Sequence, residues 1–143
     1  MRTSIYVDGF NLYYRTLKGT PYKWFDIKLL VSNLLQSQNK INEIKYFTAI
    51  VSGMFDPNHA WLDKYDCAVI ISNDSDLAEP LRIIREQHNK KIIGLLSPVI
   101  EGHPSNELQK YAHFVKRIRK GVLKASQLPD KIPGTKIHKP AQW

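Results

Sequence analysis

The stretch Ile70–Leu77 limits the fold of this chain more than any other, because an apolar run there ends in two carboxylates one residue apart. The strand predicted over residues 66–72 supplies this run, and its core, Cys67-Ala-Val-Ile-Ile71, is continuously apolar, as in a strand that is covered on both faces. A second segment has the same build: an apolar run from Ile5 ends at Asp8, and Asn11 follows after a turn. Ligands of parallel α/β sheets bind at the carboxyl ends of the strands, so we expect both segments to contribute to one site.

Strand and helix signals alternate along the chain. We predict strands over residues 3–7, 44–51, 66–72, 91–96 and 114–118, and helices over 26–37, 75–87 and 105–112. Asp26 is expected to cap the first of these helices, and Pro80 predicts a bend or a late regular start in the second. The alternation predicts an α/β fold with three layers, α/β/α, around a mostly parallel, doubly wound sheet.

Charge divides the 143 residues into a nearly neutral body and a basic tail. The formal net charge is +8, and residues 116–143 hold eight Lys or Arg but only one acid, Asp130. We interpret residues 1–120 as one domain and residues 121–143, which contain three prolines, as an extended or surface-wrapped tail. A cationic tail suits a polyanionic partner such as RNA, and a purely solubilising tail is the alternative.

Nothing in the sequence predicts a membrane protein. Apolar runs fall well short of the roughly 20 residues that a membrane helix needs, and no basic-then-apolar leader precedes the first strand. The expectation is therefore a cytoplasmic protein with no membrane partner. The sequence leaves the oligomeric state open, including a homo-oligomer.

Asp8, Asp74 and Asp76 are the candidate metal ligands and catalytic residues. Mg²⁺ prefers oxygen ligands and usually takes one or two carboxylates together with substrate phosphate. A bound divalent cation also relieves the repulsion between clustered carboxylates. Each residue has a simpler alternative role: Asp74 or Asp76 can cap a helix, and Asp8 can be an ordinary turn residue.

Supporting and nucleic-acid-binding roles fall on residues beside these acids and in the basic segment. Asn11, Ser72 and Asn73 are expected to orient an acid, a water or a phosphate, or else to shape the turns. Aromatic and cationic side chains alternate after the first strand, a pattern that suits base stacking and phosphate contacts with single-stranded nucleic acid. Phe10 is expected to be a core residue instead. The candidate nucleic-acid contacts are Arg15, Lys18, Tyr13, Tyr14, Lys116, Arg117 and Arg119.

Two motifs together resemble the bacterial NYN-domain group of PIN-like nucleases: Tyr6-Val-Asp-Gly-Phe-Asn-Leu12, and Ser72-Asn-Asp-Ser-Asp-Leu77 followed by Pro80-Leu-Arg. The segment Gly121–Asp130 is also similar to members of this group. The resemblance implies a PIN-like fold and a ribonuclease that depends on Mg²⁺ or Mn²⁺. By motif position it makes Asp8, Asp74 and Asp76 the acidic ligands and Asn11 the supporting polar residue.

The chain departs from that family pattern in its central segment. Family members carry a longer interval there, with a helix and a further acidic ligand, whereas this chain has only residues 52–65. Asp56 and Asp63 occur in the interval but not in the family motif. The resemblance therefore predicts an incomplete acidic site and leaves open a catalytically impaired RNA-binding module. A phosphate-binding domain of flavodoxin-like architecture ranks last, because no glycine-rich phosphate loop is present.

Overall fold

A computed structural model of the protein describes residues 1–48, 60 and 62–143. Within these residues, none of the helices combines the length and the apolar character needed to cross a bilayer. Among the described residues, strands and helices alternate along the chain, except that β3 is the element that follows β2. They are β1 (Arg2–Asp8), α1 (Gly9–Leu12), a π-helical turn (Tyr13–Leu17), α2 (Ile27–Leu34), β2 (Lys40–Phe47), β3 (Cys67–Ile71), a 3₁₀ turn (Ser75–Leu77), α4 (Ala78–Gln87), β4 (Ile92–Ser97), α5 (Asn106–Tyr111), β5 (Phe114–Arg117) and α6 (Lys120–Ala125).

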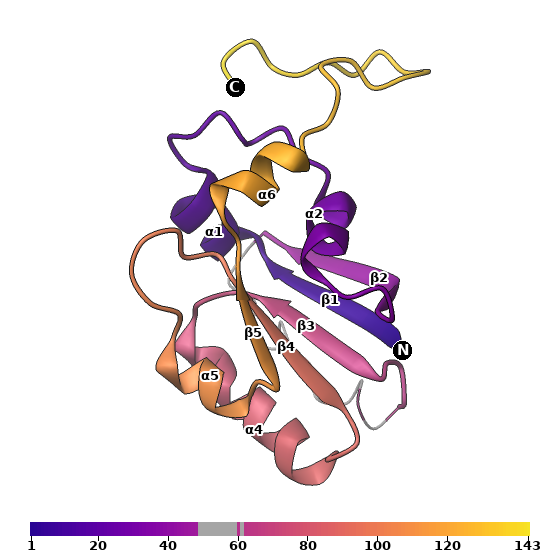
Figure 1. Ribbon diagram of the computed structural model, residues 1–143, viewed down its shortest axis with the longest axis vertical. Helices are drawn as coiled ribbons and strands as arrows, with labels where there is room; N and C mark the ends of the chain where they lie inside the picture. Colours follow the sequence, from indigo (N-terminus) through magenta and orange to yellow (C-terminus); the bar gives the residue numbers. More distant parts are fainter. Residues whose placement is uncertain (49–59, 61) are drawn as a thin grey trace.

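The five strands form one sheet in the order β2-β1-β3-β4-β5, and every neighbouring pair is parallel (Figure 1). The chain builds outward from β1 to β2 and then crosses to the other side of β1 to begin β3. This reversal makes the boundary between β1 and β3 the topological switch point, where open α/β sheets bind ligands outside the carboxyl ends of the strands.

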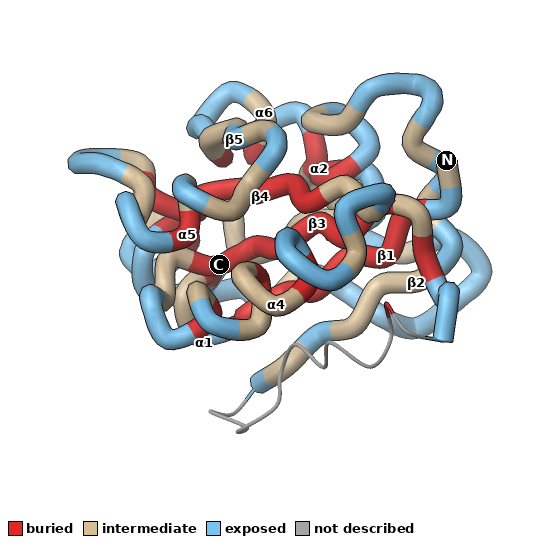
Figure 2. The backbone as a smooth tube through the Cα atoms, turned by 90° about the horizontal axis from the view of Figure 1, so that it is seen from below, coloured by how far each residue is buried: buried red, intermediate tan, exposed pale blue. Residues whose placement is uncertain are grey.

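Helices cover both faces of the sheet, so the predicted three-layer α/β/α fold is confirmed. On one face, a cluster that includes Val7 and Val69 packs with residues of α2 and α6. On the other face, Tyr6 and Ile70 pack with residues of α4 and α5. Buried residues follow β1, β3 and β4 through the centre, whereas β2 is only partly covered (Figure 2). The continuously apolar run predicted as a doubly covered strand is β3, whose five residues are all buried.

Local signals located most elements correctly. Asp26 caps α2 by accepting the backbone N–H of Leu29 at 3.0 Å. A 3₁₀ turn precedes α4, which begins at Ala78 and so has Pro80 in its first turn. Proline is tolerated there because the N–H groups of a first turn have no intrahelical partner, and the expected late start is confirmed.

Three local predictions need correction. The second strand begins at Lys40, four residues earlier than predicted, and the end predicted for it lies outside the described residues. The first long helix ends at Leu34, because Leu35 is already extended at its C-cap. The tail is not extended from its beginning: α6 carries Leu123, which is fully buried.

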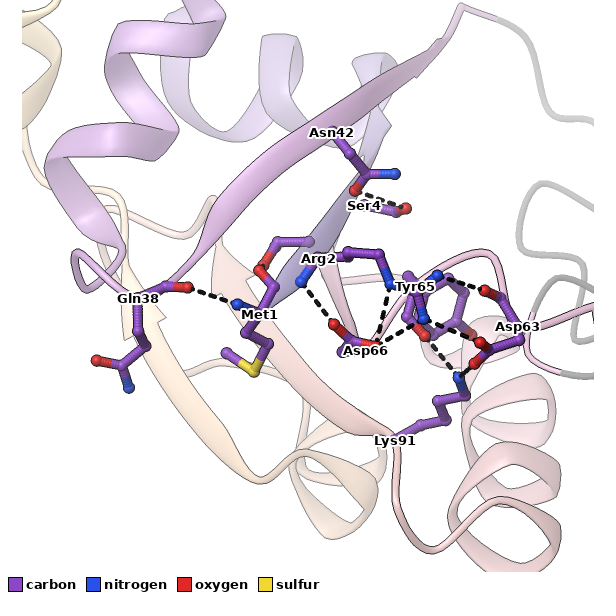
Figure 3. Close-up of polar contacts among 10 residues, drawn as sticks. Met1, Arg2, Ser4, Gln38, Asn42, Asp63, Tyr65, Asp66 and Lys91 are labelled. Atoms are coloured by element: carbon purple, nitrogen blue, oxygen red, sulfur yellow. Dashed lines mark hydrogen bonds and ion pairs between the residues drawn. The ribbon is translucent and has the colours of Figure 1, made fainter.

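Ion pairs join the starts of three strands at the amino-terminal edge of the sheet (Figure 3). The Arg2 guanidinium lies 2.8 Å from Asp66 Oδ1 and 3.0 Å from Asp63 Oδ2. Lys91 Nζ donates to Asp63 and to the backbone oxygen of Tyr65. Since Arg2 begins β1, Asp66 precedes β3 and Lys91 precedes β4, the cluster fixes the relative positions of these strands.

This cluster predicts an acid-sensitive contribution to stability. Hydrogen bonds from Arg2 lower the pKa of Asp66 from 3.8 to about 2. A depressed folded-state pKa contributes stability that is complete above pH ~4 and is lost as the pH falls toward 2. We expect Asp66→Asn to lower the Tm by about 2–4 °C at pH 7, a modest effect because the partners are half-exposed and screened. Thermal melts should show this difference disappearing between pH 4 and 2, and a pH-independent difference would contradict the assignment.

Candidate functional site

Asp8 is buried at the carboxyl end of β1, and both of its oxygens are used. Oδ1 accepts the backbone N–H of Asn11 at 3.0 Å, which caps α1. Oδ2 accepts the side-chain amide of Asn11 at 2.6 Å and the hydroxyl of Ser72 at 2.9 Å. A carboxylate offers about four acceptor positions, so three hydrogen bonds fix its orientation and leave capacity for one further partner.

Ser72 connects this carboxylate to the second acidic segment. It follows β3 directly and is fully buried. Its Oγ donates to Asp8 Oδ2 and accepts the backbone N–H of Asp74 at 3.0 Å. One hydroxyl oxygen therefore lies within 3.0 Å of the Asp8 carboxylate and of the Asp74 backbone. The ends of β1 and β3 thus meet at the switch point.

Asp74 and Asp76 occupy different environments. Asp74 is half-buried, and its Oδ1 accepts the backbone N–H of Asp76 at 3.1 Å, capping the 3₁₀ turn. Asp76 is exposed in that turn. Over residues 1–48, 60 and 62–143, no three side chains of the His, Cys, Asp and Glu types gather closely enough to hold a metal ion. The helix-cap alternative thus describes Asp74, and Asp8 also acts as a cap.

The supporting polar residues divide between the site and the neighbouring turn. Asn11 donates to Asp8 and accepts Arg15 Nε through its own Oδ1 at 3.0 Å, so Arg15 is coupled to the acid through one amide. Asn73 Oδ1 instead accepts the backbone N–H of Ser105 at 2.7 Å. Asn73 therefore joins the turn after β3 to the start of α5, which is the turn-shaping role.

The candidate RNA contacts form two separate groups. Lys18 Nζ lies 5.0 Å from the centre of the Tyr14 ring, so the cations and aromatic residues after β1 stay together beside Asp8. Lys116 donates to the last turn of α2 through the oxygen of Leu34, and Arg117 donates to Gly102. Arg119 is exposed immediately before α6. This second group lies on and after β5 at the far edge of the sheet.

Among the described residues of the interval 52–65, no acid lies at the carboxyl-terminal edge of the sheet, where Asp8 is found. Asp63 is committed to Arg2 and Lys91 at the amino-terminal edge of the sheet, opposite Asp8 (Figure 3). Asp56 lies outside the described residues. At the switch point, the contact recorded among the described residues joins the Asp8 carboxylate to the Asp74 backbone through Ser72.

Two aromatic residues differ from the sequence interpretation. Phe10 is 44% exposed, so the prediction that it is a core residue was wrong. It lies in α1, which Asp8 caps, on the side of the helix that faces solvent. Tyr46, assigned only as a strand residue, lies across from Val7 near the site. Partial burial and then the charge of Asp8 raise the pKa of Tyr46. Only the pairing of β1 with β2 could have identified it.

Comparison with known proteins shows a similar fold and identifies no function for this chain. No protein-family model matches the chain. A crystal structure of a protein of unknown function from Vibrio parahaemolyticus is similar with a TM-score of 0.56 and 15% identity, covering 83% of this chain and 93% of that one. The chain is 41% identical over 64 residues to 6-hydroxy-3-succinoylpyridine 3-monooxygenase HspA from Pseudomonas putida, over 34% of this chain. It thus spans 20% of the length of that relative.

Proposed function

We propose that this protein hydrolyses RNA phosphodiesters with a divalent cation, as a PIN-like nuclease of the NYN-domain group. The observation that supports this proposal is the hydrogen-bonded chain Asp8–Ser72–Asp74 at the switch point of the sheet. The activity named for the Pseudomonas protein does not enter the proposal, because the aligned stretch is a fifth of that protein.

The donor set fits a cation that is shared with the substrate. Mg²⁺ in phosphoryl-transfer sites is usually held by one or two carboxylates, several waters and substrate phosphate, without a cage made only of protein. Asp8 and Asp74 would hold it, and Asp76 remains a candidate for contact through water. When bound, the cation supplies Lewis-acid stabilisation of the charge that develops on the phosphodiester.

The residues of the chain position the acids and counter their charge. Asn11 and Ser72 fix the Asp8 carboxylate, and each also bonds to a second group that limits its own rotation. Arg15 holds Asn11 and carries a positive charge beside the acidic edge, where it can attract the phosphate of an approaching RNA. Such preorganisation reduces the reorganisation needed at the moment of reaction.

A catalytically impaired RNA-binding module is the second candidate. It is favoured by the fact that the described residues gather fewer than three potential metal ligands at any point and that Asp63 is used elsewhere. This candidate keeps the basic surface and predicts salt-sensitive RNA binding without turnover.

Labelled single-stranded RNA incubated with Mg²⁺ or Mn²⁺ distinguishes the candidates. We expect cleavage by the unaltered protein, no cleavage after chelation by EDTA, and a rate at least about a hundredfold lower for Asp74→Asn. Asparagine still accepts the N–H of residue 76 as a cap, so the variant removes charge while preserving the local fold. Equal cleavage by both proteins would indicate a contaminant. Binding without cleavage by either would support the RNA-binding module.

A further inference from the structure

An aromatic hollow lies immediately beside Asp8. It is open to solvent and has a volume of about 300 Å³, at the lower end of the size of small-molecule sites. Four of its lining rings are strongly solvent-exposed, although soluble proteins usually bury most of their large aromatic area. The lining residues come from α1, the π-helical turn and the end of β2; they are Gly9, Phe10, Tyr13, Tyr14, Tyr46 and Thr48.

The rings of one wall form an ordered platform. Phe10 and Tyr14 are nearly parallel, with centroids 6.0 Å apart and an interplanar angle of 16°. Tyr13 meets Tyr14 edge-on at 5.1 Å. Tyr14 is the most exposed of the four rings, at 58%, and Lys18 places a positive charge over it. The platform therefore combines solvent-exposed ring area with a cation that lies over one of its rings.

The opposite wall is held close to the acid. Tyr46 lies on β2, one residue before the residue that pairs with Asp8. Gly9 allows α1 to approach this strand, because a Cβ at Gly9 would lie 2.6 Å from the Tyr46 ring and 2.7 Å from the Phe47 backbone oxygen. The hollow thus begins at the residue that follows Asp8. Any group bound in it lies beside the proposed site.

We propose that this hollow binds one unstacked base of single-stranded RNA, which places the adjoining phosphate at Asp8. The inference rests on the proposed action on RNA and names the substrate class as single-stranded. Every nucleobase has a π face, so an aromatic platform with a cation beside it binds without reading sequence. A base inside a duplex is already paired and stacked, so a duplex of the same sequence cannot fill the hollow.

The test measures binding of a fluorescent single-stranded octanucleotide RNA by anisotropy in EDTA, where cleavage is suppressed. Tyr14→Leu and Tyr46→Leu are expected to weaken binding about tenfold, because leucine keeps apolar bulk but has no π face. Tyr14→Trp should restore it. Tyr111→Leu, which removes an aromatic ring at the end of α5 and outside the hollow, should leave binding unchanged, and the matching duplex should bind more weakly than the single strand.

The outcomes separate this inference from the nuclease proposal, since binding and cleavage are measured independently. Weakened binding by both leucine variants, with no cleavage by the unaltered protein, would retain the base site and remove the nuclease. Unchanged binding by both variants would overturn the base site even if the unaltered protein cleaves RNA. A change in oligomeric state with unchanged RNA binding would also overturn it, by showing that the hollow contacts protein. A thermal melt of each variant checks that it is folded.

Discussion

Asp8→Asn is expected to reduce RNA cleavage at least about a hundredfold and to weaken Mn²⁺ binding, because it removes the carboxylate fixed at the switch point. Asparagine keeps one oxygen that can accept the Asn11 backbone N–H, so the cap of α1 survives. Its amide would, however, face the Asn11 amide that lies 2.6 Å from Asp8 Oδ2. Two donors cannot share that contact, and Asn11 cannot reverse its amide without giving up its bond to Arg15.

The measurements are the cleavage rate on single-stranded RNA and isothermal titration with Mn²⁺. Asp26→Asn is the matched control, since Asp26 also caps a helix through an equivalent 3.0 Å bond but lies at the start of α2. This control should change neither measurement. Cleavage by Asp8→Asn at the rate of the unaltered protein would remove Asp8 from the proposed mechanism, and a thermal melt distinguishes lost chemistry from lost folding.

Much of this edge of the sheet was predictable from sequence because the signals there are local. A fully apolar pentapeptide before Ser72 is typical of a strand covered on both faces, and the polar residues that follow then lie at its carboxyl end. The same reasoning places Asp8 at the end of β1. Alternation with helices requires parallel strands, and parallel strands bring their carboxyl ends to one edge.

The parts that sequence did not predict depend on pairing between distant segments. Ser72 joins the Asp8 carboxylate to the backbone of Asp74 only because β1 and β3 are neighbours, and strand order is not encoded in local periodicity. Tyr46 belongs to the site only through the register of β2 with β1. Phe10 was placed in the core because it is large and apolar, but the short α1 presents it to solvent. Amino-acid composition gives no information about which face a four-residue helix exposes.

The interpretation of the basic tail shows the same limit. Its prolines and weak periodicity suggested an extended or surface-wrapped segment without a helix, because six residues are too few for a helical repeat to be recognised. The structure places α6 against α2, and the chain beyond it continues to contact the body: Ser126 accepts the backbone N–H of Asp26 at 2.8 Å, and Pro129 accepts the indole N–H of Trp24 at 2.9 Å. Residues 121–143 therefore carry positive charge and also contribute packing contacts to the fold.

Leu123→Ala is accordingly expected to destabilise the protein by about 2–5 kcal/mol, the range for removing a fully buried leucine side chain. Leu123 packs in the same cluster as Leu30 and Val31 of α2, so truncation leaves a cavity between the two helices. Urea denaturation measures the change, and Ile137→Ala is the control because Ile137 is 55% exposed in the same tail. Equal stability of the two variants would show that α6 is dispensable.

If Leu123→Ala is destabilised as expected, deletion of residues 121–143 cannot test the role of charge in RNA binding, because the deletion also removes a core residue. Removal of residues 131–143 eliminates three lysines without disturbing Leu123.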